Sequence, residues 1–175
     1  MSESYGKPLP EPSIDSKPFW DGLKEHRILL QTCANCGKKR HYPRPVCDAC
    51  HSMEYDWTEA SGRGTIYSWT ESHHPFHIGF KAEVPYILVT VDLEEGVRLQ
   101  SQLLGAKLQD LALGLPVQAV FADAAEGIVL PYFRLNEHNE RIDNDYHGTD
   151  GPLSVEDRRF NHPLTNAFVD AAVTW

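Results

Sequence analysis

Four cysteines stand in two closely spaced pairs in the first third of the chain. Cys33 pairs with Cys36 and Cys47 with Cys50, two residues separate the members of each pair, and ten residues separate the pairs. Each C-x2-C pair forms a tight turn that presents two thiolates, and two pairs complete a tetrahedron around one ion. Because four thiolates leave no open coordination position, we expect one structural zinc ion whose binding contributes folding free energy.

Two other interpretations of the cysteines stay open. Rubredoxin-type iron also uses four thiolates, and Gly37 suits a rubredoxin turn, but His51 stands where the second pair would need the matching glycine. Two disulfides would require an oxidising compartment, and residues 1–11 contain no apolar stretch typical of a secretory signal. No apolar run approaches the roughly 20 residues that cross a bilayer. We therefore expect a cytoplasmic protein with reduced cysteines.

A short basic segment lies between the cysteine pairs of an acidic chain. The formal net charge is −9, yet residues 27–44 contain five basic residues and no acid, which leaves −14 for the rest. A metal would fix both ends of this loop and preorganise it for an anion. The basic loop is either a solvated tip of the ribbon or a site for a phosphate-bearing, nucleotide-like ligand. That site would place phosphates on Lys38, Lys39, Arg40 and Arg44, with a base stacked on Tyr42 or His41.

Three histidines, His73, His74 and His77, lie close together in residues 72–80. They could bind a metal or act in acid–base chemistry, but such a cluster is more often a polar loop with exposed rings. The chain has no carboxylate pair, nucleophile turn or phosphate-binding loop that would identify a catalytic site. We therefore predict no catalytic residue.

A short helix is expected to precede the cysteines. It begins near Asp15 or Ser16, either of which can cap it, and it places Phe19, Trp20 and Leu23 on one face. This face is expected to pack on the body of the protein. The alternative is a partner-binding helix, because large aromatic side chains make strong anchors.

After the cysteines the pattern changes to period two, which is typical of strands. The predicted strands are 64–72, 85–93, 97–104, 117–123 and 128–135, with a hairpin at 94–96 and a helical turn in 107–113. Five short strands with that insert indicate a small closed barrel of the OB type. Pro131 predicts an edge position or a bulge in the last strand.

The predicted fold is thus mainly β, with four segments. They are an N-terminal arm and helix (1–27), a zinc ribbon (28–57), an OB-fold barrel (58–136), and an acidic linker with an amphipathic helical tail (137–175). The tail helix is expected over 163–175, where apolar residues recur at helical spacing.

Several motifs in one fixed order resemble the acyl-CoA-associated zinc-ribbon/OB-fold family, over about residues 14–136. They are Phe19-Trp20-Asp21-Gly22-Leu23, Gln31-Thr32-Cys33, Cys36-Gly37, Pro43-Arg44-Pro45-Val46-Cys47, the strand entry Ala60-Ser61-Gly62-Arg63-Gly64-Thr65-Ile66-Tyr67-Ser68-Trp69, and Pro85-Tyr86.

The resemblance implies a non-catalytic accessory subunit. Members of this family partner with thiolase-superfamily enzymes of acyl transfer or thiolase-like aldol cleavage, including steroid side-chain degradation, and help to hold the CoA ester. The basic loop would then bind the phosphates and base of acyl-CoA. The candidate partner-binding side chains are Phe19, Trp20, Leu23, Phe76 and Phe80.

The C-terminal tail departs from that family. Residues 146–155, 162–165 and 167–169 look like an internal fragment of glucose–methanol–choline oxidoreductases. No G-x-G-x-x-G fingerprint occurs in the chain, so flavin binding is not expected. The tail is either a docking helix or a fusion remnant.

Two other classes of function compete with the accessory role. Zinc ribbons and OB barrels often bind nucleic acids, but the acidic body opposes a polyanion. An independent CoA-thioester enzyme would have to use His73, His74 or His77, and no nucleophile with a nearby base is apparent. We therefore expect an acyl-CoA ligand and a thiolase-like partner, and neither nucleic acid nor membrane.

Overall fold

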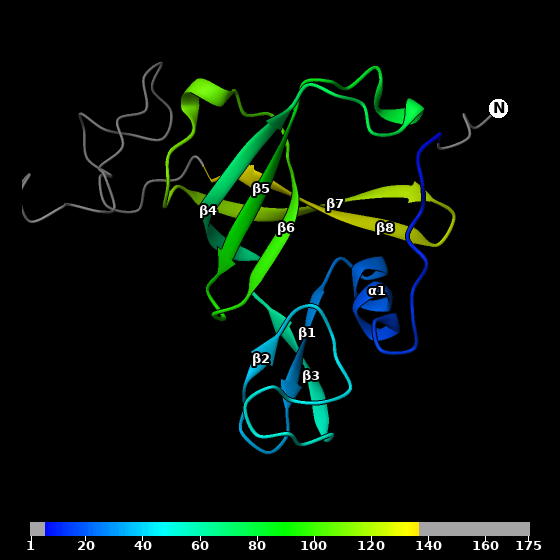
Figure 1. Ribbon diagram of the computed structural model, residues 1–175, viewed down its shortest axis with the longest axis vertical. Helices are drawn as coiled ribbons and strands as arrows, with labels where there is room; N and C mark the ends of the chain where they lie inside the picture. The colour runs from blue at the N-terminus through cyan, green and yellow to red at the C-terminus, as the bar shows by residue number, and fades with distance from the viewer. Residues whose placement is uncertain (1–5, 137–175) are drawn as a thin grey trace, which may run out of the picture. The chain divides into compact units, whose positions relative to one another are not determined.

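The computed structural model describes residues 6–136, which form a helix, a three-stranded sheet and a closed β-barrel (Figure 1). Helix α1 spans Lys17–Lys24, and the small sheet has the order β2-β1-β3. Its strands are β1 (Ile28–Cys33), β2 (Lys39–Arg40) and β3 (Tyr55–Ala60). The barrel closes in the order β4-β5-β6-β8-β7. Its strands are β4 (Arg63–Ser72), β5 (Tyr86–Leu93), β6 (Arg98–Leu103), β7 (Pro116–Ala125) and β8 (Ile128–Leu135), with 3-10 turns η1 (Ile78–Phe80) and η2 (Leu108–Asp110).

This architecture confirms the predicted fold class: mainly β, with a helix before the cysteines and a five-stranded barrel after them. Every predicted strand begins and ends within two residues of the observed one. The predicted acidic linker and tail helix, residues 137–175, lie outside the described residues. Among residues 6–136, no helix is long and apolar enough to span a membrane.

Helix α1 connects the two sheets, because it packs against both β1 and β8. Phe19 and Leu23 are buried, at 5% and 0% exposure, and join the core of the barrel. A Cβ at Gly22 would meet the Leu29 side chain at 2.6 Å, so the helix sits directly on β1. The structure therefore favours internal packing for Phe19 and Leu23, while Trp20 is half-buried.

The barrel core follows the strand alternation seen in the sequence. Its most deeply buried side chains include Phe133, Val91 and Ile66. Strand β8 pairs with β7 along its length but meets β6 in parallel at one registered pair. Pro131 pairs with Phe121 in the β7–β8 ladder, and its carbonyl accepts a hydrogen bond from the Ser101 hydroxyl. The barrel is closed and the register shift of this ladder lies between Asp123 and Ala125, so the predicted edge position or bulge at Pro131 is not observed. The missing N–H of Pro131 is tolerated because β8 meets β6 at only one registered pair.

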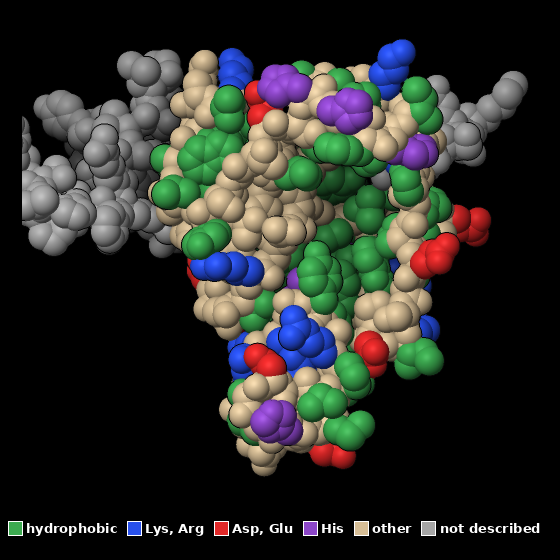
Figure 2. Space-filling model, viewed as in Figure 1, with side chains coloured by type: hydrophobic (Ala, Val, Ile, Leu, Met, Phe, Trp, Pro, Cys, Tyr) green, Lys and Arg blue, Asp and Glu red, His purple; other side chains and the backbone are tan. Residues whose placement is uncertain are grey.

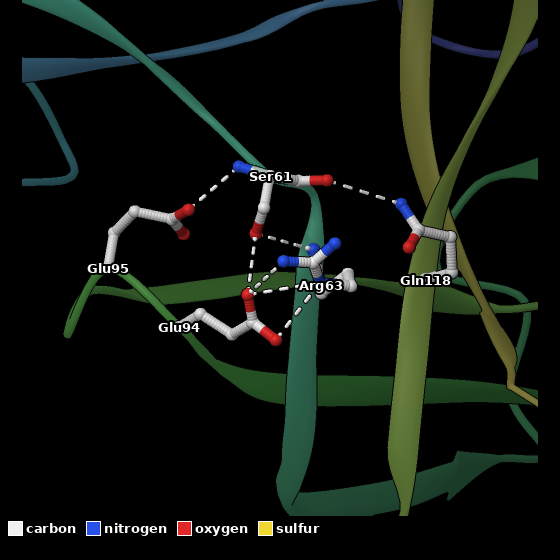
Figure 3. A network of polar contacts seen from close by, with 5 residues as sticks. All are labelled: Ser61, Arg63, Glu94, Glu95 and Gln118. Atoms are coloured by element: carbon white, nitrogen blue, oxygen red, sulfur yellow. Dashed lines mark hydrogen bonds and ion pairs between the residues drawn. The ribbon is translucent and has the colours of Figure 1, made fainter. Parts of the chain in front are cut away.

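The Ser-Gly-Arg-Gly motif ties the start of the barrel to the β5–β6 hairpin (Figure 3). The backbone N–H of Ser61 donates to Glu95 Oε1 at 2.7 Å, and the Ser61 hydroxyl donates to Glu94 Oε2 at 3.3 Å. Arg63 donates from Nε and Nη2 to the Glu94 carboxylate at 2.9–3.0 Å. Gln118 Nε2 reaches the Ser61 carbonyl at 3.4 Å. The network fixes the hairpin beside the ribbon–barrel junction.

The second glycine of the motif is required by close packing of β4 on β5. A Cβ at Gly64 would meet the Asp92 carbonyl oxygen at 2.5 Å and Val91 Cγ1 at 2.6 Å. Gly64→Ala is expected to destabilise the protein by ~1–3 kcal/mol, because a backbone oxygen cannot move aside without distorting the strand. Urea denaturation measures the change. Gly6→Ala is the control, because a Cβ at this position would meet nothing within 4 Å; equal stability of the two variants would contradict the packing argument.

Candidate metal centre and adjoining basic pocket

The four cysteine sulfurs form a compact cluster at the end of the small sheet. All four Sγ atoms lie within 4.8 Å of one another. The short contacts join the two turns: Cys33 to Cys50 at 3.5 Å and Cys36 to Cys47 at 3.6 Å. A tetrahedron with metal–sulfur bonds of ~2.3 Å has sulfur–sulfur edges of ~3.8 Å. The sulfurs therefore already have the spacing of a four-thiolate metal cage.

The two cysteine turns have the same backbone geometry. Gly37 has φ +72° and donates its N–H to the Cys33 carbonyl at 2.9 Å. His51 has φ +59° and donates its N–H to the Cys47 carbonyl at 2.9 Å. The second turn therefore needs no glycine, because His51 adopts the left-handed conformation itself, at a cost of ~1–2 kcal/mol. A preformed metal cage explains how that strain is tolerated.

The turns also prepare the sulfurs for a cation. Backbone N–H groups, that of Cys36 first, lower the pKa of the Cys33 thiol, and that of Ala49 likewise lowers the pKa of Cys47. The Lys38 N–H lowers the pKa of Cys36, but the neighbouring cysteines outweigh it and raise this pKa to about 12. Without a cation, Cys36 therefore keeps its thiol proton, and a metal ion that binds the four sulfurs has to displace this proton.

Gln31 holds the loop between the cysteine turns from inside. Its side chain is fully buried, and its Oε1 accepts hydrogen bonds from Arg40 Nε at 2.5 Å and from the Arg44 backbone N–H at 2.8 Å. Arg40 is 7% exposed and also donates from Nη2 to the Arg44 carbonyl at 3.1 Å. Because Gln31 faces Arg40 in the β1–β2 register, the sheet itself sets this arrangement.

An aromatic column runs from helix α1 to the surface of the same loop. Trp20 meets Phe19 edge-on at 5.4 Å, Phe19 meets His41 at 4.8 Å, and His41 meets Tyr42 at 4.2 Å between ring centroids. Burial lowers the pKa of His41 to about 4, so the imidazole is neutral near pH 7. Tyr42 is 62% exposed at the end of the column. Of the two predicted stacking residues, Tyr42 is the one that offers an open ring face.

The predicted ligand residues line one small pocket together with the β5–β6 hairpin. Its volume is about 210 Å³. The ribbon contributes Lys38, Lys39, Arg40, His41, Tyr42, Arg44 and Asp48, and the hairpin contributes Gly96, Val97 and Arg98. Figure 2 shows Lys and Arg side chains gathered over the ribbon, below a hollow lined by hydrophobic side chains. The structure thus brings the predicted basic residues to one place.

Arg98 is the pocket residue that the sequence did not reveal. It stands 54 positions after Arg44, and nothing in its local pattern separates it from an ordinary surface residue of a hairpin. Its guanidinium lies 3.4 Å from the Tyr67 ring centroid, and its Nε donates to Asp92 at 2.6 Å. These contacts hold the side chain on the hairpin at the pocket.

The four predicted cations do not have equal environments. Lys38 forms an ion pair with Asp48 at 2.6 Å, and this contact raises the pKa of Lys38. Arg40 is buried, as described above. Lys39 and the Arg44 guanidinium form no ion pair within residues 6–136, and Arg44 is exposed.

The histidine loop, residues 73–85 between β4 and β5, exposes large apolar side chains and is held in place through Phe80. Phe76 and Ile78 are 80% and 74% exposed. The Phe80 ring packs tilted against Tyr86, with the ring centroids 5.6 Å apart, and the Lys7 ammonium lies 5.0 Å from the Phe80 ring centroid. In the part of the chain that the structure describes, the cysteine cluster is the only group of three or more side chains arranged for a metal, so the histidines form no such group.

Comparison with known proteins agrees with this geometry. Residues 20–56 match the family described as ChsH2, rubredoxin-like zinc ribbon domain, and residues 57–122 match ChsH2, C-terminal OB-fold domain. A DUF35 domain-containing scaffold protein of Methanocaldococcus jannaschii is 30% identical over 116 residues, which cover 63% of this chain and 82% of that protein. The chain belongs to the DUF35 family. This confirms the resemblance to acyl-CoA-associated zinc-ribbon/OB-fold proteins.

One solved DUF35 structure is similar throughout its length. It is described as an Ltp2-ChsH2(DUF35) aldolase, and it superposes with a TM-score of 0.67 and 36% identity over 72% of this chain and 98% of that chain.

Other DUF35-related matches are to longer proteins. A probable enoyl-CoA hydratase alpha subunit of Thermomonospora curvata is 39% identical over 71% of this chain. The chain spans 39% of the length of that relative, and 36% of a 3-oxo-4,17-pregnadiene-20-carboxyl-CoA hydratase alpha subunit of Mycobacterium tuberculosis. A separate 43-residue match, 49% identical, covers 8% of an oxygen-dependent choline dehydrogenase of Rhizobium johnstonii, which confirms the short resemblance to oxidoreductases.

Metal removal tests the cysteine cluster. We expect emission spectrometry to find one zinc per DUF35 chain, and Cys47→Ser to cost ~4 kcal/mol or more, because loss of a metal site is among the largest single-residue effects. Ala49→Ser introduces the same side chain into the same turn without touching a ligand, so its stability should stay within ~0.5 kcal/mol of the parent. A metal-free protein with an unchanged melting curve would contradict the metal site, and iron in place of zinc would favour the rubredoxin-type alternative.

Proposed function

We propose that this DUF35 protein is a non-catalytic, zinc-containing subunit that binds acyl-CoA and supports a thiolase-superfamily enzyme. The observation on which this rests is the similarity to the DUF35 chain of an Ltp2-ChsH2(DUF35) aldolase, which extends over 98% of that chain. The similarity to a DUF35 scaffold protein supports the non-catalytic part of the proposal. Aldol cleavage or acyl transfer on a CoA ester would then be the reaction of the partner.

The surface of the chain offers two environments that suit a CoA ester. The basic pocket can receive phosphate, and Tyr42 offers an exposed ring for a base. Base–aromatic stacking contributes about 1–3 kcal/mol. Next to the cations, on the same face, Figure 2 shows the hollow lined by hydrophobic side chains. CoA has the same order of parts: a phosphorylated nucleotide followed by a long, less polar arm.

The histidine loop offers a docking surface for the partner. Two large apolar side chains, Phe76 and Ile78, stand almost fully in solvent on a loop that Phe80 and the N-terminal arm hold in place. A Cβ at Gly79 would meet the Gly6 carbonyl at 2.3 Å, so the arm lies directly against the loop. Exposed apolar groups on a preorganised loop lose little entropy on binding. We place the docking site at Phe76, with Phe80 as its support and Trp20 as a second candidate.

Association with the partner tests this proposal. The tagged full chain should co-purify from its native cell with a thiolase-fold protein, and the complex should turn over a CoA ester that the chain alone leaves unchanged. Phe76→Ala should weaken the complex by about tenfold or more, because buried aromatic anchors dominate interfaces. Met53→Ala is the control, since Met53 is 66% exposed and lies on the ribbon.

Two outcomes would count against the proposal. Turnover of CoA thioesters by the chain alone would remove the non-catalytic role. Normal assembly by folded Phe76→Ala and Trp20→Ala variants would move the docking site elsewhere.

A second candidate function is a subunit of an enoyl-CoA hydratase. The names of the Thermomonospora and Mycobacterium relatives favour it, although the match covers little more than a third of each. Both functions use acyl-CoA, so the co-purified partner decides between them: a hydratase-fold protein would replace the thiolase-like partner without changing the ligand.

A further inference from the structure

Arg40 is a buried charge without a counter-ion in the described chain. It is 7% exposed, and its two hydrogen-bond acceptors, Gln31 Oε1 and the Arg44 carbonyl, are both neutral. Its Nη1 is closed off from solvent and has no partner within residues 6–136. A guanidinium stays charged at any pH the protein meets. The Tyr55 ring lies 5.8 Å from the guanidinium carbon, but a ring compensates a buried charge less than an anion does, so an anion is expected nearby.

The pocket above Arg40 is strongly cationic. Five basic side chains and a single carboxylate line it, and that carboxylate, Asp48, is paired with Lys38. Lys39 and Arg44 form no ion pair among the described residues, although the charge of Arg44 helps to lower the pKa of Asp48, after the hydrogen bond from Lys38. Arg98 is held at the pocket by Asp92 and Tyr67. Charges interact more strongly across a buried, low-dielectric region than in water. Arg40 lines the pocket but is 7% exposed, so its charge raises the potential of the pocket mainly across this buried region.

The size of the pocket limits what can enter. Its volume of about 210 Å³ lies below the ~300–1,000 Å³ of sites that enclose a small molecule. A phosphate group fits this space, which is open to solvent and does not enclose a whole nucleotide. The remainder of the ligand must lie outside, where Tyr42 is exposed.

We propose that this pocket binds a terminal phosphate monoester, with Lys39, Arg44 and Arg98 as its ligands and Arg40 as a buried positive charge beneath it. A terminal phosphate has nearly two negative charges at pH 7 and three acceptor oxygens, one for each of the three ligand side chains. A phosphodiester or an internal pyrophosphate has fewer free oxygens and less charge per phosphorus. This inference rests on the proposed function, and it assigns the pocket to the 3′-phosphate of CoA.

Calorimetry in phosphate-free buffer tests the assignment with the full-length, zinc-loaded chain. CoA should bind about tenfold or more tightly than dephospho-CoA, because hydrogen bonds to charged groups are the strong ones. Arg98→Gln and Arg44→Gln should each reduce this ratio to below about threefold. Lys24→Gln removes one positive charge from helix α1 at a residue that does not line the pocket, and it should leave the ratio unchanged.

The outcomes separate this assignment from the proposed function. Equal affinity for CoA and dephospho-CoA, or a ratio that persists in Arg98→Gln, would overturn the phosphate assignment while leaving CoA binding in place. Binding of neither compound would overturn both. Arg40→Gln removes the buried positive charge of the pocket, so its ratio of affinities should fall as well.

Discussion

The four-cysteine cage is the constraint on which the ribbon and its basic loop depend. The ribbon has few buried apolar side chains of its own, and at its centre lie the polar residues Gln31 and Arg40. Such a segment cannot offset its loss of conformational entropy by apolar burial alone. One ion bound by the four thiolates would close both ends of the loop between the cysteine turns. It would thereby fix the basic side chains and Tyr42 in their observed positions.

The barrel contributes the other half of the site through its β5–β6 hairpin. The Ser61–Arg63–Glu94 network holds that hairpin beside the ribbon–barrel junction, and Arg98 follows immediately in the chain. The Ser-Gly-Arg-Gly motif therefore has a structural role in this chain. By holding the hairpin it helps to position Arg98, which lies in the basic pocket. Helix α1 supports the same region by placing Phe19 beneath His41.

Local patterns were enough to predict the five barrel strands, the helix and a four-cysteine cluster, but not the three short strands of the ribbon. The alternation of side chains along a strand and the two-residue spacing within each cysteine pair are properties of short stretches of chain, so they are visible in the sequence without a structure. The basic loop was predicted for the same reason, since Lys38 to Arg44 are contiguous. Burial could not be predicted there: Arg40 and Lys39 look alike in sequence, and only the β1–β2 register shows that Arg40 faces inward against Gln31. Arg98 was missed because a tertiary contact, and no local pattern, brings it to the pocket.

The most direct test of ligand binding by the ribbon and the hairpin is a crystal structure of the zinc-loaded protein with CoA, alone or on its catalytic partner. We predict a terminal phosphate between Arg44 and Arg98, with the adenine against Tyr42 and the thiol-bearing arm directed over the hydrophobic hollow. A CoA molecule bound in the crystal without any contact to the ribbon loop or the β5–β6 hairpin would contradict this prediction.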